Sequence, residues 1–414
     1  ALLAVAFAAG CTQPPVGKST SRKHTNLMAD PTVREWRDEV IYQLMVDRFA
    51  DGDRSNNYQV DRSRMASYHG GDWQGVIDKL DYLEALGVTA LWISPVVRNV
   101  EEDAGFASYH GYWTQGFSST NPHFGDMAKL QQMVDAAHDR GMLIILDIVT
   151  NHVGQLFYYD INGNGQPDDV LVGVGVKDNC KMPCQATCEA KCQSRKACGS
   201  DSTCISECEG ECRQICLSTV TRTSEWDPDF DVRGIQGCTS LGESGPAAIE
   251  WLYIPEINRV PPLPAEFQNK DWYNRRGRVT DWNDYEQVEK GDFPGGLKDL
   301  NTLNPEVQGA LTRVFQDWIT WGDFDGFRID TLKHVEHGFW QVFCPGIRQH
   351  AASLGKRNFL MFGEAFDGDD VLVGSYTFNN EVDSVFYFPH KFWVFDDVFK
   401  WGQPTSKIRT LYEM

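Results

Sequence analysis

Short apolar runs alternate along the chain with stretches whose apolar residues recur at helical spacing. The runs occupy residues 39–49, 88–96, 142–151, 324–330, 359–366 and 382–388. The amphipathic stretches between them occupy residues 73–86, 129–140, 305–321 and 339–354. A strand–helix alternation of this kind predicts a parallel sheet with helices packed outside it, which is an α/β fold.

Polar and charged residues gather where three of the predicted strands end. They are Asp147, Asn151, His152, Arg328, Asp330 and Glu364. The carboxyl ends of the strands in a β/α barrel face the active site, so these side chains would converge there. A doubly wound sheet also gathers sites at strand ends, but no glycine-rich phosphate loop follows the first strand. We therefore predict a (β/α)8 TIM barrel.

The chain carries about six of the eight strands that such a barrel needs. The alternation is lost from residue 152 to residue 300, which predicts an inserted subdomain after the third strand. Residues 36–151 and 301–414 would form the barrel, which we expect to be incomplete because the chain stops in what reads as the helix after strand six.

The composition is that of an acidic globular protein. Of the 414 residues, 42% are hydrophobic and 12% aromatic, and the formal net charge is -20. Nucleic acid is excluded as a partner because phosphate binding needs a basic surface. The acidity is compatible with a neutral substrate and bound cations, although a solvated acidic surface accounts for most of the surplus charge without any function.

The first residues look like the end of an export signal. Residues 1–10 are apolar but too few to span a bilayer, which takes about 20 residues. The string that ends at Cys11 is similar to the lipobox of bacterial lipoproteins, with Ala8 where Leu is usual. We expect a signal remnant over residues 1–11, a lipid on Cys11 and a tether over residues 12–35; an ordinary signal with a chance cysteine is the alternative. The protein would be extracellular, periplasmic or lipid-anchored at a bacterial cell envelope.

Ten cysteines fall between residues 180 and 238. Eight of them recur at every fourth position in two blocks, so each block lies along one helix face. An antiparallel helical hairpin over residues 178–218 would pair Cys192 with Cys204, Cys188 with Cys208, Cys184 with Cys212 and Cys180 with Cys216, and Cys198 would join Cys238. Disulfides are favoured over zinc because zinc sites favour C-x-x-C pairs.

Asp330 and Glu364 are the candidate catalytic pair. Retaining glycoside hydrolysis needs an ionised carboxylate that attacks the sugar carbon and a protonated carboxyl that donates to the leaving oxygen. Arg328 lies two residues before Asp330 and so on the same side of the strand, where its charge would keep Asp330 ionised. The residues around Glu364 are apolar, a setting that raises the pKa of a carboxyl towards that of a general acid.

Three strings resemble signature segments of the α-amylase family of glycoside hydrolases, in the family's order. They are DIVTNH at 147–152, GFRIDTLKH at 326–334 and GEA at 363–365. The strings YHGYW at 109–113, GGDWQG at 70–75 and LKDLN at 297–301 add to the match. The resemblance implies an α-amylase that cleaves internal α-1,4-glucosidic bonds of starch-like glucans. We expect a monomer whose partner is an α-glucan polysaccharide or oligosaccharide.

The resemblance also assigns roles to the matching residues. Asp330 would be the nucleophile and Glu364 the acid/base, while Arg328 would hold Asp330 in its charged form. The family's fourth segment, a His-Asp pair at the end of strand seven, has no counterpart after Glu364. This gap leaves open a non-catalytic glucan-binding protein, and a cyclodextrin-forming transglycosylase is the runner-up among enzymes.

Other matching residues would bind the substrate. His152 would hydrogen-bond the sugar at the cleavage subsite, and Tyr112 would stack on that sugar. Asp147 would be the structural aspartate near the arginine of the site. Lys333 would contact the leaving-group side, and the pair it forms with His334 favours an endo-acting α-amylase.

Two calcium sites follow from the resemblance, and their oxygen ligands are those that Ca²⁺ prefers. One would use the side chains of Asp51, Asp53, Asn56, Asn57 and Asp72 and the carbonyl of Gly70. The other would use Asn151, Asp299 and the carbonyl of His334. A third candidate, similar to the start of an EF-hand loop, comprises Asp160, Asn162, Asn164 and Asp168; it has Leu171 where the bidentate Glu belongs, and Asn-Gly pairs are also plain turn formers.

Overall fold

A six-stranded parallel sheet organises the computed structural model, which describes residues 35–159, 165, 192–193, 200–209, 248–279, 281–293 and 295–413. Its strands follow one another in chain order: β1 (Ile41–Leu44), β2 (Ala90–Ile93), β7 (Leu143–Ile148), β12 (Gly326–Ile329), β13 (Leu360–Gly363) and β14 (Ser384–Val385). Each strand pairs in parallel with the next. All six predicted strands are therefore confirmed, and so is the α/β class.

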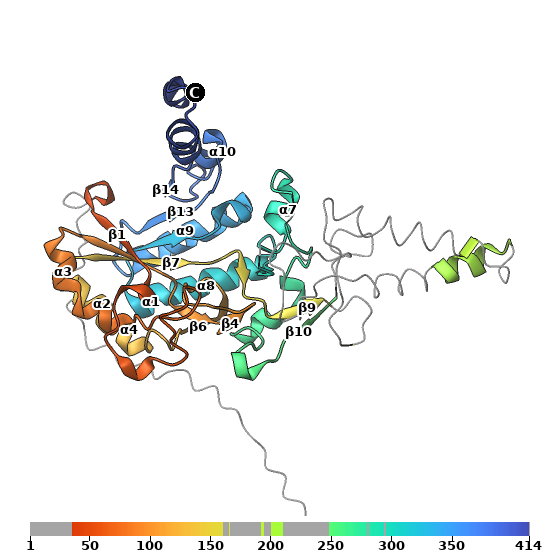
Figure 1. Ribbon diagram of the computed structural model, residues 1–414, viewed down its shortest axis with the longest axis horizontal. Helices are drawn as coiled ribbons and strands as arrows, with labels where there is room; N and C mark the ends of the chain where they lie inside the picture. The colour runs from red at the N-terminus through yellow and green to blue at the C-terminus, as the bar shows by residue number, and fades with distance from the viewer. Residues whose placement is uncertain are drawn as a thin grey trace, which may run out of the picture.

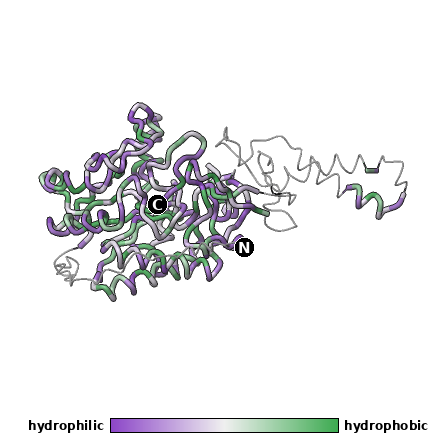
Figure 2. The backbone as a smooth tube through the Cα atoms, turned by 90° about the horizontal axis from the view of Figure 1, so that it is seen from below, coloured by the Kyte–Doolittle hydropathy of each residue, from purple (hydrophilic) through white to green (hydrophobic). Residues whose placement is uncertain are grey.

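Helices connect the strands on the outside of the sheet (Figure 1). The main ones are α2 (Trp73–Asp78), α3 (Leu80–Ala85), α4 (Met127–His138), α8 (Pro305–Gly322) and α9 (His337–Ser353). The coiled segments of the backbone in Figure 2 carry both purple and green residues, as expected of helices with one face on a core. The predicted helix over 73–86 is divided at Lys79, which has φ -110° and ψ 4°.

The helix starts follow from side-chain caps. Asp126 accepts a hydrogen bond from the Lys129 amide at the start of α4, and Asn304 accepts one from the Glu306 amide at the start of α8. Pro305 opens α8 at a position where a missing N–H costs nothing. Asp323 ends α8 in the left-handed conformation.

Shorter elements complete the described part. The helical ones include α1 (Val46–Phe49), α7 (Tyr285–Lys290), η6 (Leu332–His334), α10 (Asp370–Ser375), the π-helical η7 (His390–Lys400) and α11 (Ser406–Glu413). Antiparallel pairs join β3 (Val97–Asn99) to β6 (Thr114–Thr120), β4 (Glu102–Asp103) to β5 (Phe106–Ala107), β8 (His152–Val153) to β11 (Lys298–Asp299), and β9 (Phe157–Tyr159) to β10 (Ile249–Trp251). In Figure 1, η7 and α11 project beyond β14.

The segment predicted as an insertion leaves the sheet and returns to it at one place. His152, one residue after Asn151, is in register with Asp299 across the β8–β11 pair. The two ends of the segment are thereby joined by backbone hydrogen bonds. The domain boundaries at residues 152 and 300 stay a prediction.

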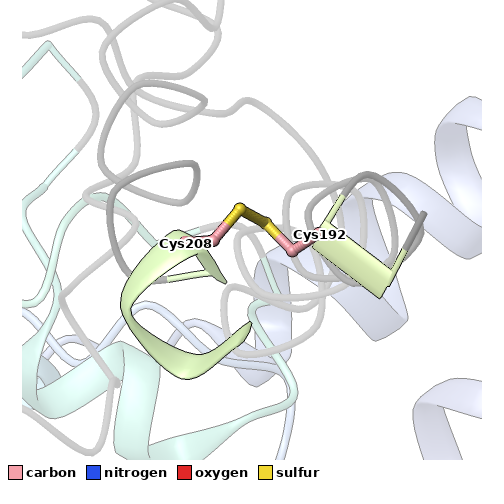
Figure 3. The surroundings of a disulfide bond; sticks show 2 residues. All are labelled: Cys192 and Cys208. Carbon is pink, nitrogen blue, oxygen red and sulfur yellow. A yellow bond between two sulfur atoms is a disulfide. The ribbon is translucent and has the colours of Figure 1, made fainter. Parts of the chain in front are cut away.

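The cysteine pairing predicted from the two blocks of evenly spaced cysteines is wrong. Cys192 forms a disulfide with Cys208, with 5.8 Å between their Cα atoms, and not with Cys204 (Figure 3). Cys204 is also in a disulfide. Because Cys208 pairs with Cys192, the predicted pairing of Cys188 with Cys208 is wrong as well. The helical residues 202–209 begin after Asp201, whose side chain accepts from the Cys204 amide. Cys208 lies one helical turn further from this start than Cys204, so the predicted register was wrong by four residues.

The other cysteines of the predicted hairpin lie outside the described residues, as do Cys11 and the predicted signal and tether up to residue 34. Among the described helices, none is both long and apolar enough to cross a membrane.

A buried ion network holds the strands and helices together at the amino ends of the strands. Asp325, the residue before β12, accepts from Lys356 Nζ at 2.7 Å and from the Ile144 amide of β7 at 2.9 Å. His138, at the end of α4, contacts Asp325 at 2.8 Å and Asp323 at 3.4 Å. Burial alone would lower the pKa of His138, but the hydrogen bonds to both aspartates outweigh it and raise that pKa to about 9.

The raised pKa of His138 predicts a loss of stability at alkaline pH. The protonated histidine stabilises the fold fully below its ordinary pKa of 6.5, and this contribution is lost as the pH rises through about 9. We expect His138→Gln to remove about 3 kcal/mol of this pH dependence, measured as the free energy of unfolding in urea between pH 6 and pH 10. The control His350→Gln, on the outer part of α9, should leave the change of the unfolding free energy with pH as it is in the wild type. If the unfolding free energy of His138→Gln changed with pH as it does in the wild type, His138 would not be the group that stabilises the fold through this network.

Candidate active site

Arg328 lies at the centre of a cluster of three carboxylates. Its Nη1 donates to Asp147 Oδ1 at 2.8 Å and to Asp330 Oδ1 at 2.9 Å, and its Nη2 donates to Glu364 Oε2 at 2.5 Å. The strands β7, β12 and β13 lie side by side, and their register places Arg328 opposite Asp147 and opposite Phe362, two residues before Glu364. The structure thus brings four of the six residues that the sequence singled out at three strand ends into one cluster.

Asp147 is held by donors on three sides. Besides Arg328, the Trp92 Nε1 donates to its Oδ2 at 3.0 Å and the Tyr112 hydroxyl donates to the same oxygen at 2.8 Å. The side chain of Asp147 is fully buried. Asp147 therefore holds the guanidinium of Arg328 through Nη1, while Nη1 also donates to Asp330 and Nη2 donates to Glu364.

The cluster has one positive charge for three carboxyl groups. Burial raises the pKa of Asp330, and the charge of Arg328 opposes this rise. Burial also raises the pKa of Glu364, again opposed by Arg328 and reinforced by the neighbouring Asp330. The Glu364 side chain is 28% exposed whereas that of Asp330 is 12% exposed. Glu364 is therefore the more accessible of the two for exchanging a proton with a bound molecule.

The histidines around the cluster are neutral. Burial lowers the pKa of His110, of His152 and of His334 to about 4 in each case. His152 lies with its Nε2 3.2 Å from the Tyr112 carbonyl and its ring stacked on Phe293. His152 thus contacts the backbone of the Tyr112 segment, and its predicted bond to the substrate stays a prediction.

Lys333 and His334 link the end of β12 to neighbouring segments. Lys333 Nζ donates to the Phe366 carbonyl at 2.9 Å and to Asp367 Oδ2 at 3.1 Å. His334 Nδ1 lies 2.9 Å from the Val288 carbonyl in α7. The pair therefore connects the strand end that carries Asp330 both to the loop after β13 and to the inserted segment.

Three oxygens converge where the second calcium site is predicted. The side-chain oxygen of Asn151 lies 2.9 Å from the His334 carbonyl and 3.2 Å from Asp299 Oδ1, with no donor between them unless the amide is turned round. Asp299 is buried, and burial raises its pKa well above the ordinary value. One amide, one carbonyl and one carboxylate oxygen at such spacing fit the ligand chemistry of Ca²⁺.

The first predicted calcium loop also presents oxygens without donors. Asn57 Nδ2 donates to Asp51 Oδ2 at 2.9 Å. Asp51 Oδ1, Asn56 Oδ1 and Asn57 Oδ1 are buried, and none has a hydrogen-bond partner within the described part of the chain. Gly70 has a φ of 84°, and a Cβ there would lie 2.3 Å from Asn57 Oδ1, so only glycine fits beside these oxygens.

Two other members of that predicted ligand set also accept hydrogen bonds from the loop. Asp72 caps α2 by accepting from the Gly75 amide at 2.6 Å, and it also accepts from the Asp53 amide at 2.8 Å. Asp53 Oδ1 accepts from the amide and the hydroxyl of Ser55. The third candidate, Asp160 to Asp168, falls outside the described residues. No group of three or more His, Cys, Asp or Glu side chains placed to hold a metal occurs in the described part.

Sequence reasoning missed Trp92 and Leu332. Trp92 lies inside an apolar run that carries no polar cue, and it reaches Asp147 only because β2 pairs with β7. Leu332 is fully buried, and a Cβ on Gly363 would lie 2.6 Å from its side chain. The glycine before Glu364 is a recognisable signal, but its partner is set by the tertiary structure.

Comparison with known proteins identifies the family. A family model described as the alpha amylase catalytic domain matches residues 43–169 and 261–411. The chain belongs to the alpha-amylase family. The resemblance found in the sequence is thereby confirmed, and the enzymes of this family are glycoside hydrolases.

Individual relatives agree with this assignment. The chain is 46% identical over 310 residues to alpha-amylase mde5 of Schizosaccharomyces pombe, which covers 75% of the chain and 41% of the relative. It is 28% identical over 351 residues to a cyclomaltodextrin glucanotransferase of Klebsiella oxytoca, covering 82% of the chain and 40% of the relative. The chain thus spans less than half the length of these curated relatives.

A solved structure also shows the fold of this family. The crystal structure of an alpha-amylase from Anoxybacillus matches with a TM-score of 0.54 and 28% identity, over 86% of this chain and 53% of that one. The curled parallel sheet of six strands corresponds to part of the TIM barrel of such amylases, so the predicted fold class is confirmed.

The support of Asp147 by Tyr112 predicts a stability effect. Tyr112→Phe removes one donor from a buried carboxylate, so the free energy of unfolding in urea should fall by about 2 kcal/mol. The matched control is Tyr109→Phe, because the Tyr109 hydroxyl makes no hydrogen bond to the described residues. Equal losses in the two variants would show that the Tyr112 hydroxyl does not stabilise the cluster.

Proposed function

We propose that this protein is an α-amylase, a retaining hydrolase that cleaves internal α-1,4-glucosidic bonds of starch-like glucans. The observation that carries the proposal is that one guanidinium, that of Arg328, bonds both Asp330 and Glu364. Two carboxyl groups on one guanidinium are close enough for the short separation, about 5 Å, that retaining glycosidases use.

The proposed reaction has two steps. Asp330 attacks the anomeric carbon and forms a glycosyl ester, while Glu364 donates its proton to the departing glycosidic oxygen. Glu364, now ionised, takes a proton from a water molecule that attacks the ester, which releases the sugar and regenerates both carboxyl groups. Arg328 supports both steps because it stabilises the carboxylate form of each residue in turn. Neutral histidines suit a site that binds an uncharged sugar by hydrogen bonds and stacking.

The choice of hydrolysis over transfer rests on the relatives. The chain is most alike, among the proteins compared above, to one named as an alpha-amylase. The Lys333–His334 pair matches α-amylases and cyclodextrin-forming relatives alike, so it does not separate the two activities. A transglycosylase would use the same glycosyl ester but pass it to a sugar hydroxyl instead of water. Cyclic products from soluble starch would identify that activity.

We also propose that the protein binds Ca²⁺ at the two oxygen clusters. Asn151, Asp299 and the His334 carbonyl would hold one ion, and the loop of Asp51, Asn56 and Asn57 would hold the other. The ions would supply structural charge compensation; in particular, the buried Asp299 would have a cation beside it. The site at Asn151 would tie the inserted segment to the barrel.

Export of the protein is a further part of the proposal. The disulfide between Cys192 and Cys208, and the second one at Cys204, are expected of a protein that folds in an oxidising compartment. The lipid anchor at Cys11 and the monomeric state remain predictions from the sequence.

The catalytic pair is tested by separating its two roles. Asp330→Asn should abolish hydrolysis of soluble starch, and Glu364→Gln should lower kcat/KM by about 10²–10⁴-fold. With an activated aryl glycoside, which needs no proton for its leaving group, only Glu364→Gln should release the aryl alcohol in a first burst. The control Glu84→Gln, exposed on α3, should retain full activity. Comparable starch hydrolysis by Asp330→Asn and the wild type would refute the nucleophile assignment.

The protonation of Glu364 predicts the alkaline limb of the pH profile. Because its pKa is raised, kcat/KM should stay high above the ordinary pKa of 4.5 and fall as the pH rises through the raised value. Steady-state kinetics between pH 4 and pH 10 will show this limb. A profile of Glu364→Gln with the same alkaline limb would assign the limb to another group.

Calcium binding is tested by titration calorimetry of the metal-free protein. Asp299→Asn and Asn56→Ala should each remove one bound ion, because they alter different clusters, whereas Asp271→Asn, on the surface, should remove none. Calcium at about 100 times its Kd should stabilise the wild type by about 2.7 kcal/mol for each bound ion. Unchanged stoichiometry in both variants would rule out these ligand sets.

A further inference from the structure

Thr331, the residue directly after Asp330, has a left-handed backbone. Its φ is 49° and its ψ is 36°, between the end of β12 and the start of η6. A β-branched residue rarely adopts this region, because its Cβ crowds the following carbonyl. Thr331 is 7% exposed, and its hydroxyl makes no hydrogen bond to any described residue. The fold therefore keeps a costly conformation and a buried polar atom beside the nucleophile.

The other left-handed positions of the chain show how unusual this choice is. Seven further non-glycine residues with positive φ occur in the described part: Gln59, Ala104, Asn258, Arg275, Asp323, Asn379 and Asn380. Four of them are Asn or Asp, which tolerate this conformation. None of the seven is β-branched, so Thr331 differs from all of them in kind.

The turn at Thr331 sets the direction of both chain segments that flank it. Before it, the Asp330 amide donates to the Ile148 carbonyl of β7 at 2.9 Å. After it, the His334 amide donates to the Thr331 carbonyl at 2.9 Å, which closes the first turn of η6. The extended chain thus passes into η6 through the single left-handed residue Thr331, with hydrogen bonds on either side of it.

The residues after Thr331 contact the end of β13 and the residues that follow it, which include Glu364. Leu332 is fully buried against Gly363, which precedes Glu364, and Lys333 bonds the Phe366 carbonyl two residues after it. The Glu364 amide itself donates to the Ile329 carbonyl of β12 at 2.9 Å. The turn at Thr331 therefore links two parts of the site. The residue before it is Asp330, the proposed nucleophile, and the residues after it contact the neighbours of Glu364, the proposed acid/base.

A residue with a Cβ is confined to a narrow left-handed region, whereas glycine occupies a much broader range of positive φ. A β-branched side chain adds stiffness at χ1. At this position stiffness is useful, because small displacements of reacting groups cost large factors in rate.

We propose that Thr331 is a positioning residue of the glycoside-cleaving site. Its Cβ confines the turn after Asp330 and so fixes the separation between Asp330 and Glu364, at a cost in stability. This inference rests on the proposed function. It assigns the effect to the backbone of Thr331, and not to a contact between its hydroxyl and the substrate.

The experiment compares four variants of the full chain. Thr331→Ala keeps a Cβ and Thr331→Gly removes it, so this pair isolates the backbone. Thr331→Val removes the hydroxyl at nearly constant shape. Ala104→Gly is the matched control, because Ala104 has a φ of 50° in the turn between β4 and β5, away from the carboxylate cluster.

Thr331→Gly should melt about 2 °C higher than Thr331→Ala, because glycine relieves the left-handed conformation. Its kcat on soluble starch should nevertheless fall at least about tenfold, with KM within twofold, while Thr331→Ala and Thr331→Val stay within about threefold of the wild type. The alkaline limb of kcat/KM should move in Thr331→Gly alone, since it depends on the distance between the two carboxyl groups. Ala104→Gly should raise the melting temperature without changing kcat.

Equal losses of kcat in Thr331→Gly and Thr331→Ala would overturn the positioning role, as would a Thr331→Gly variant that is fully active. A loss in Thr331→Val would assign the effect to the hydroxyl and overturn it as well. A wild-type chain that does not cleave α-glucans would instead refute the proposed function, and the melting comparison would still report whether the turn is strained.

Discussion

The buried charge of Arg328 is the constraint on which the rest of the site depends. A guanidinium taken out of water costs several kcal/mol unless it is paired, and here three carboxylates pair it. That pairing requires β7, β12 and β13 to lie side by side and to end at the same level. The parallel sheet in chain order provides this geometry, because successive strands become neighbours and all their carboxyl ends face the same way.

The same cluster explains how two similar carboxyl groups come to differ. Asp147 has no part in the proposed chemistry, yet its negative charge keeps Arg328 in place and adds to the excess of negative charge. With one cation for three carboxyl groups, the cluster favours a bound proton, and the burial of all three groups reinforces this. Glu364 is the most exposed of the three and is therefore the one best placed to exchange a proton with a bound molecule. The proposed acid and nucleophile thus differ in accessibility as well as by one methylene group.

The inserted segment is part of the site, and not only an addition to the barrel. It begins and ends at the β8–β11 pair, and its α7 accepts a hydrogen bond from His334. Asn151, Asp299 and the His334 carbonyl meet at this junction. The position of the chain after Asp330 is consequently determined both by the sheet and by the insertion, which gives the strained turn at Thr331 fixed attachments on either side.

The sequence by itself determined the strands, the main helices and the residues proposed to react. Period-two and period-3.6 patterns are local, and the family segments are written in consecutive letters, so both can be read without a structure. The tertiary structure decided what depends on distance between remote segments. It placed Trp92 on Asp147 and turned His152 towards the Tyr112 carbonyl. It also joined Cys192 to Cys208, although the even spacing of the cysteines had predicted Cys204 as the partner. It also decided the left-handed turn at Thr331, since local preference alone disfavours that conformation for threonine and only the contacts of both flanking segments impose it.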